Sequence, residues 1–137
     1  MAFDIERTEY FNFTVTNHAE DSYKLLSVFA SVGISLLAFK AVSVESGRIR
    51  FTLFPNDTFK MAAAAKKAGL EIDGPHSALI VEGDDESGAL ADIFDRLAQA
   101  EIDMHESSGI ADIKGGFGVV FYLDEEDYEK AAAVLAA

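Results

Sequence analysis

Residues 25–34 read LLSVFASVGI, and residues 93–102 read IFDRLAQAEI. The apolar positions of the first stretch recur in the second at a constant displacement of 68 residues, from Leu25 to Ile93 and from Ile34 to Ile102. Self-similarity at one fixed spacing is the sign of a repeated structural unit. The spacing therefore predicts that one unit is present twice.

The match extends in both directions at displacements of 67 to 69 residues, which small changes of loop length between two copies would produce. We predict two copies, residues 1–69 and 70–137. A chain this short buries only about 60% of its surface when alone, so we expect the copies to pack on each other. The further matching segments are 3–6 (FDIE) with 70–73 (LEID), Phe11 and Phe13 with Leu79 and Val81, and 59–64 (FKMAAA) with 128–133 (YEKAAA).

Each copy shows readable periodicity. In the first, Tyr10–Thr16 alternates apolar and polar residues, which predicts a half-buried strand. A helical stripe follows and stops at Gly33, the residue type preferred where a helix ends in a left-handed conformation. Two further strands, Ile34–Val44 and Arg48–Phe54, are predicted on either side of a turn at Ser46-Gly47.

A second helix is predicted from Asn56-Asp57 to Lys66-Lys67, with the basic residues at the end that the helix dipole favours. Each unit thus reads strand, helix, strand, strand, helix, with one short strand before it. This order predicts an α+β fold of two ferredoxin-like βαββαβ units in tandem, with antiparallel sheets and helices on one face.

The short strands leave two arrangements open. Leu70–Asp73 could be the fourth strand of the first unit, and Phe3–Glu6 would then serve the second unit by closing the chain back on itself. Alternatively, each short strand forms a hairpin with the strand that directly follows it. Both arrangements place the short strand beside the first strand, and the sequence does not choose between them.

Composition excludes several functions. The 137 residues include 11 Lys+Arg and 24 Asp+Glu, a formal charge of −13, which argues against binding to nucleic acid or to an anionic membrane. The chain has no cysteine, which excludes thiol catalysis and disulfides. Neither a signal peptide nor an apolar run of about 18 residues is visible, so we expect a cytoplasmic protein.

The segment Asp84–Leu90 lies between the predicted first strand and first helix of the second copy. Its Asp85-x-x-Gly88-x-Leu90 pattern resembles the D-x-P-G-x-L turn of ACT domains, small regulatory modules that bind amino acids, although Ser87 replaces the proline. Residues 97–104 (LAQAEIDM) and 123–131 (LDEEDYEKA) resemble the regulatory ACT segment of aspartate kinases. The resemblance covers nearly all of the second copy, and the first follows through the repeat.

The resemblance implies a ligand site between two ACT units, formed by this turn and by the start of a neighbouring unit's second strand. Backbone N–H groups at a helix N-terminus can hold a carboxylate, and a glycine allows close approach. Alternatively, Asp84–Ser87 only caps the helix. The implied ligand-binding residues are Asp85, Glu86, Ser87, Gly88, Ala89, Ile102, Asp103 and Met104 in the second unit, and Asn17, His18, Ala19, Glu20, Ile34, Ser35 and Leu36 in the first.

No other motif carries chemistry. The acidic runs 84–86 and 124–127 lack calcium-loop spacing, and the segment 114–118 (KGGFG) lacks the ending of a phosphate loop and precedes a strand. The three histidines do not have metal-ligand spacing, and no nucleophile elbow is present. We therefore expect no catalytic residue, no metal and no cofactor.

We predict a non-catalytic regulatory protein that binds a small molecule, an amino acid. The alternative is a structural or protein-interaction module with vestigial ligand turns, and the lack of glycine in Asn17–Glu20 favours it. We expect a homo-oligomer, a dimer or larger, because both faces of Ile34–Val44 are apolar. The equivalent strand in the second copy carries polar residues, so we expect it to be exposed or to face a ligand.

The charge is uneven. Residues 1–69 hold 8 basic and 7 acidic side chains, whereas residues 70–137 hold 3 basic and 17 acidic ones. We therefore expect subunits to meet through the first unit or between unlike units. The acidity also favours a neutral or cationic amino acid as the ligand of the second unit.

Overall fold

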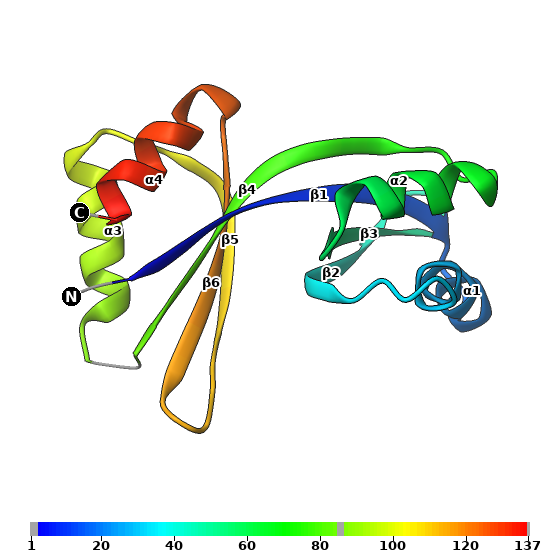
Figure 1. Ribbon diagram of the computed structural model, residues 1–137, viewed down its shortest axis with the longest axis horizontal. Helices are drawn as coiled ribbons and strands as arrows, with labels where there is room; N and C mark the ends of the chain where they lie inside the picture. Colours follow the sequence, from blue (N-terminus) through cyan, green and yellow to red (C-terminus); the bar gives the residue numbers. More distant parts are fainter. Residues whose placement is uncertain (1–2, 85–86, 137) are drawn as a thin grey trace. The chain divides into compact units, whose positions relative to one another are not determined.

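The computed structural model describes residues 3–84 and 87–136. Its elements confirm the predicted α+β fold of two ferredoxin-like units. In chain order they are β1 (Asp4–Thr16), α1 (Ala19–Ala30), β2 (Leu36–Val44), β3 (Arg48–Pro55), α2 (Thr58–Lys67), β4 (Asp73–Asp84), α3 (Ala89–Gln99), β5 (Met104–Ala111), β6 (Gly116–Leu123), the short 3-10 helix η1 (Glu125–Asp127) and α4 (Tyr128–Ala136) (Figure 1).

The strands follow the order β2-β3-β1-β4-β6-β5. The chain divides into two compact units: Glu9–His76, here the first unit, and Met1–Thr8 with Ser77–Ala137, here the second unit. This division differs from boundaries at 1–69 and 70–137. The reason is that β1 and β4, of 13 and 12 residues, each run through both units.

The N-terminal strand completes the second unit. Phe3 and Ile5 pack against the second unit's core, and the Phe3 ring meets the Phe117 ring edge-on at 6.2 Å between centroids. The hairpin alternative is wrong, because β1 continues without interruption from Asp4 to Thr16. The chain therefore closes back on itself.

The prediction of a strand at Leu70–Asp73 is wrong except for Asp73, where β4 begins. The Leu70 N–H donates to the Ala65 carbonyl at 2.9 Å, and Gly69 has a φ of +74°. These residues therefore finish α2 instead of starting a strand. Leu70 packs against the first unit's core, and the start of β4 supplies that unit's last strand.

The ends of α1 and α3 repeat in detail. Gly33 has a φ of +79°, as predicted, and Glu101 at the equivalent position has a φ of +58°. The Ile34 N–H donates to the Phe29 carbonyl at 3.1 Å, and the Ile102 N–H donates to the Leu97 carbonyl at 3.0 Å. The same left-handed cap therefore turns the chain into the second strand of each unit.

The first unit buries one helix-covered face of its sheet. Phe11 and Phe13 of β1 pack with Phe29 of α1 and Met61 of α2. α2 begins where predicted, because the Asp57 side chain accepts a hydrogen bond from the Lys60 N–H at 3.0 Å. The registers of β1 and of β2 against β3 are antiparallel.

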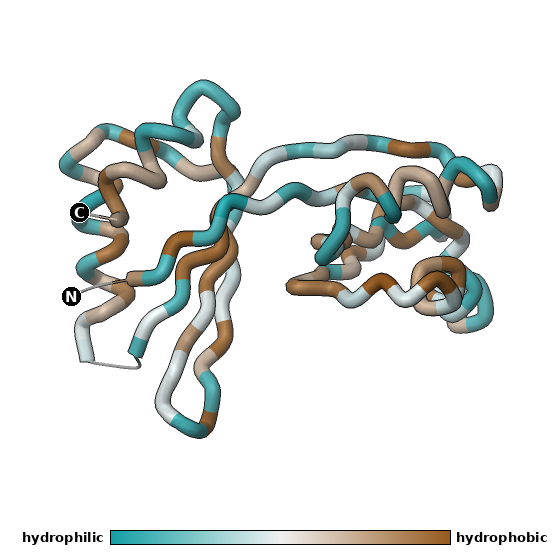
Figure 2. The backbone as a smooth tube through the Cα atoms, viewed as in Figure 1, coloured by the Kyte–Doolittle hydropathy of each residue, from teal (hydrophilic) through white to brown (hydrophobic). Residues whose placement is uncertain are grey.

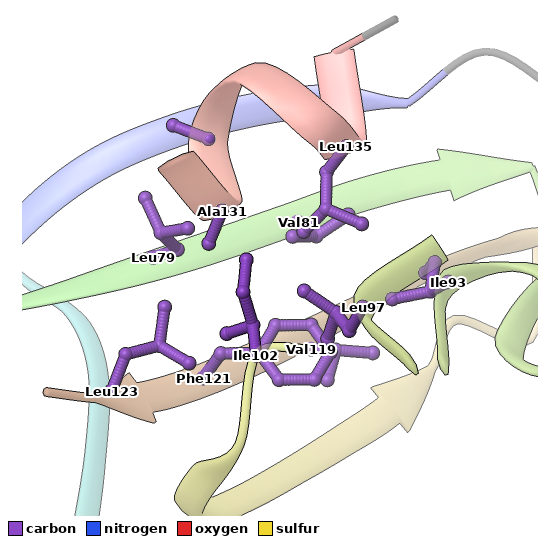
Figure 3. Packing of buried hydrophobic residues seen from close by; sticks show 11 residues of the cluster. Leu79, Val81, Ile93, Leu97, Ile102, Val119, Phe121, Leu123, Ala131 and Leu135 are labelled. Atoms are coloured by element: carbon purple, nitrogen blue, oxygen red, sulfur yellow. The ribbon is translucent and has the colours of Figure 1, made fainter. Parts of the chain in front are cut away.

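The second unit packs α3 and α4 on the same side of its strands (Figure 1). Figure 3 shows the core between them, where side chains of β4, β6, α3 and α4 converge. Figure 2 shows hydrophobic segments along these strands and a hydrophilic segment around η1. The labelled core residues are Leu79, Val81, Ile93, Leu97, Ile102, Val119, Phe121, Leu123, Ala131 and Leu135.

Among residues 3–84 and 87–136, no helix combines the length and the apolar character that a membrane crossing requires.

Candidate functional site

The predicted turn of the second unit lies at the start of α3. Gly88 is the N-cap, with φ +87° and ψ −2°, and its carbonyl accepts the Asp92 N–H at 2.9 Å. This left-handed conformation favours glycine. Ser87 is exposed and Ala89 is buried, while Asp85 and Glu86 lie outside the described residues. The backbone thus gives Gly88 a specific role at this turn.

The other predicted ligand-binding residues of the second unit, at the start of its second strand, follow the C-terminal end of α3. Ile102 is buried, Asp103 is exposed, and Met104 begins β5 half-buried. α3 has 11 residues, so its ends are about 16 Å apart. One unit therefore does not bring its own turn and its own strand start together. A site that uses both parts needs two units.

In the corresponding turn of the first unit, backbone N–H groups already donate hydrogen bonds within the protein. The Asn17 N–H donates to the Gly47 carbonyl at 2.9 Å, and the His18 N–H donates to the Thr16 carbonyl at 2.8 Å. His18 is the N-cap of α1 in an extended conformation, without a side-chain capping bond. Asn17 to Glu20 are all exposed. This turn differs from the left-handed turn at Gly88.

The first unit's strand start is also tied to its own chain. The Ser35 N–H donates to the Asn56 side-chain oxygen at 3.2 Å, and the Asn56 N–H donates to the Ser35 carbonyl at 2.9 Å. Ile34 is buried in the core, and Leu36 is half-buried. The reciprocal bonds leave the Ser35 N–H already used within the protein.

A groove of about 600 Å³ opens beside the Gly88 turn, between α3 and the strands β5 and β6 of the second unit. This volume lies within the usual range of small-molecule sites. The lining residues are Gly88–Ala91 and Phe94 at the start of α3, Ser107–Ala111 of β5 and Phe117–Val119 of β6.

Gly88 and Ala89, two of the predicted ligand-binding residues, line this groove, whereas its residues from β5, β6 and Phe94 were not predicted. A signal was available in the repeat. Ser107 stands where the first copy has Phe39. Replacing a bulky side chain by a small one leaves space between the sheet and α3. The expectation that β5 is exposed is confirmed, since Glu106 and Ser108–Ala111 are all exposed.

The first unit has a smaller groove of about 370 Å³ on the other side of its first helix. Val15, Leu25 and Leu70 form its apolar part, and Asp21 and Lys24 lie at its edge. Lys24 also forms an exposed ion pair with Glu20 at 3.2 Å. The two grooves are therefore not equivalent under the repeat.

The acidity belongs to the second unit. Its residues include four basic and seventeen acidic side chains, a balance of −13, whereas the first unit has seven of each. The net negative charge of the second unit disfavours an anionic ligand.

Two histidines contact carboxylates. His105 Nε2 lies 2.6 Å from Asp124 Oδ1, and His76 Nε2 lies 2.7 Å from Asp73 Oδ1. The His76 contact is the main cause that lowers the pKa of Asp73. The carboxylates of Asp124, Glu126 and Asp127 lie within 4.8 Å of one another and could hold a cation. Exposed acidic groups of this kind are also typical of a helix start.

Comparison with solved structures identifies the architecture. Protein BT0572 from Bacteroides thetaiotaomicron superposes with a TM-score of 0.82 over 96% of this chain and 88% of its own, at 17% identity. The ligand-free regulatory subunit of aspartate kinase from Thermus thermophilus gives 0.68 over 98% and 95%, at 11% identity. The chain has the tandem ACT fold. No protein-family model and no curated protein sequence matches it.

A third structure extends the comparison to a whole enzyme. E. coli aspartokinase III, in complex with lysine and aspartate, gives a TM-score of 0.56 at 13% identity. The match covers 98% of this chain but 32% of that one. The predicted resemblance to aspartate kinase regulatory segments is therefore confirmed for the fold.

Proposed function

We propose that this chain is a non-catalytic regulatory protein that binds an amino acid at the Gly88 turn of the second unit. The observation that carries the proposal is the groove beside that turn, which combines a glycine-capped helix start with an apolar interior. The N–H groups of the first helical turn lack acceptors within a helix and can donate hydrogen bonds to a carboxylate. The groove can then hold the rest of the ligand.

The site is completed by a neighbouring unit. Its strand start, corresponding to Ile102, Asp103 and Met104, supplies the part that α3 keeps distant within a single unit. Asp85 and Glu86 belong to the same proposed turn. This arrangement requires the expected oligomerisation, which the exposure of Phe39 (64%) and Val42 (49%) on β2 supports. Exposed apolar side chains on an edge strand are typical of an association surface.

The comparison structures support the regulatory role. The T. thermophilus protein is a regulatory subunit of aspartate kinase, and E. coli aspartokinase III was solved with lysine and aspartate. We extend amino-acid binding to the present chain on this basis together with the groove. The second unit's acidity favours a neutral or cationic amino acid.

The first unit favours a second candidate function, a protein-interaction module. Asn17, His18, Ala19 and Glu20 are exposed, but the backbone of the first two is bound internally. Ser35 is likewise paired with Asn56. On this alternative, both turns are vestigial and the exposed strand β2 is the functional surface.

Isothermal titration calorimetry of the full chain against the twenty amino acids tests the proposal. At least one should release heat on binding, and Gly88→Ala should weaken that binding about tenfold because alanine disfavours the left-handed conformation. Gly115→Ala is the matched control, since Gly115 also has a positive φ, +108°, with open space around it. If none of the twenty amino acids gives a heat of binding, the protein-interaction module is the better-supported function.

A further inference from the structure

The groove beside α3 is lined by large apolar side chains that a single chain leaves uncovered. Leu90 is 53% exposed and Phe94 is 40% exposed, both on α3. The Phe94 ring is fixed from below by the Phe121 ring, edge-on at 5.8 Å between centroids. The wall of the groove is therefore positioned by the core while its open side stays apolar.

The floor of the groove is hollow because of two small residues. Ser107 lies opposite Phe121 in the β5–β6 ladder, as Phe39 lies opposite Leu53 in the β2–β3 ladder. The two positions are therefore equivalent and lie on the same face of each sheet. Gly109 likewise replaces Ala41. A phenyl ring at position 107 would enter the space that the serine leaves open.

The opposite side of α3 is sealed by the chain itself. Phe3 contacts Phe117, and the Arg96 guanidinium carbon lies 5.1 Å from the Phe3 ring centroid. Gly83 makes room for this contact, since a Cβ there would lie 3.1 Å from a Phe3 ring carbon and 3.0 Å from a Phe117 ring carbon. The unit thus fills one side of its first helix with an aromatic ring and leaves the other side open.

We propose that the open groove holds the apolar side chain of the bound amino acid, so that the ligand is an amino acid with a branched aliphatic or aromatic hydrocarbon side chain. This inference rests on the proposed function and names its ligand class. The lining favours such a side chain because burial of apolar surface is favourable by about 25 cal/mol per Å². The unit's balance of −13 disfavours acidic ligands.

The test compares ligands on the full chain by calorimetry. Leucine, isoleucine and phenylalanine should bind at least tenfold more tightly than lysine, threonine and aspartate. Ser107→Phe, which installs the first unit's residue, should weaken the best apolar ligand at least tenfold. Ala133→Phe adds the same ring at an exposed position of α4 outside the groove, and it should leave the affinity unchanged.

A second variant protects the test against misfolding. Leu90→Ser removes an exposed apolar side chain from the wall of the groove. It installs serine, which is the residue at the equivalent position of the first unit, Ser22. It should weaken the apolar ligand about threefold to tenfold, while circular dichroism shows retained helix. If Ser107→Phe does not fold, the affinity of Leu90→Ser for the apolar ligand decides the test.

The outcomes separate the two proposals. Tightest binding of a charged or polar amino acid, or unchanged apolar binding in both groove variants, would overturn the ligand class and leave the proposed function standing. No binding of any amino acid would overturn both. If sedimentation then showed an oligomer that dissociates on Ser107→Phe, the occupant of the groove would be a second copy of the chain.

Discussion

The Arg7 guanidinium of β1 binds the Glu129 carboxylate of α4 through two contacts, Nη2 to Oε2 at 2.9 Å and Nε to Oε1 at 3.2 Å. This bidentate geometry joins the start of the chain to its last helix within the second unit. The same contact lowers the pKa of Glu129 and raises that of Arg7.

Replacing Arg7 should therefore move the titration of Glu129. In the wild type, carbon-detected NMR should give Glu129 a pKa below its ordinary value of 4.5, and Arg7→Ala should return it toward that value. Because the folded pKa is lowered, the stabilisation is present above pH 4.5 and is lost as pH falls through the folded pKa. Arg7→Lys should have an intermediate effect, since lysine keeps the charge without the fork. An unmoved Glu129 titration in Arg7→Ala would rule out the contact.

Removing residues 1–7 should destabilise the second unit. The deletion removes the Phe3 and Ile5 side chains that pack against the second unit's core. Hydrogen exchange should show faster exchange in β4, β6 and α4, with β2 and β3 less affected. Phe3→Ala should reproduce part of the effect, about 1–3 kcal/mol, because a half-buried ring contributes less than a fully buried one. Loss of protection restricted to the first unit would contradict chain closure.

The equivalent caps at Gly33 and Glu101 give a matched pair of opposite changes. Glu101→Gly should raise the free energy of unfolding by about 1 kcal/mol, because a non-glycine residue at φ +58° carries strain. Gly33→Ala should lower it by about the same amount. The neighbourhood has room for the new methyl group, since its nearest atom, Lys60 Nζ, is 3.7 Å away. Urea denaturation of both variants measures the two values. Equal signs would refute the equivalence of the caps.

The Asp73 carboxylate should make the first unit acid-sensitive. It accepts from Asn12 Nδ2 at 3.3 Å as well as contacting His76, and its pKa is lowered from its ordinary value of 3.8. Its stabilisation is present above pH 3.8 and is lost as pH falls through the lowered pKa. Asp73→Asn should flatten the dependence of Tm on pH below 3.8. His76→Gln should flatten it partly, and an unchanged slope in both variants would argue against this role.

Residues at helix caps and turns correctly predicted where the helices and the hairpin begin or end. Gly33 indicated the end of α1, Asp57 the start of α2 and Ser46-Gly47 the hairpin, because caps and turns depend on a few neighbouring residues. The repeat displacement of 68 then transferred these features to the second unit, where Glu101 takes the cap conformation without being a glycine. Backbone geometry was thus more conserved between the copies than residue type.

Long-range features were harder to predict. The polar run from Glu6 to Glu9 interrupts the apolar alternation and looks like a boundary, yet β1 continues through it because partner strands lie beside both halves. The groove exists because β5 carries the small residues Ser107 and Gly109. An analysis of apolar periodicity detects large apolar residues and gives no signal for small ones. Comparing Ser107 with Phe39 would have revealed the groove, because the repeat supplies the expected bulk.

The long strand β1 also determines the order in which the two units can complete their folding. The ribosome makes residues 3–8 before their packing partners Phe117 and Glu129, which emerge more than a hundred residues later. By then all of the first unit, Glu9–His76, has been synthesised and can fold. The second unit therefore cannot form these contacts until Glu129 has been synthesised, and contacts so distant along the chain slow folding. During synthesis, the N-terminal strand is an unprotected edge that a chaperone or another nascent chain could engage.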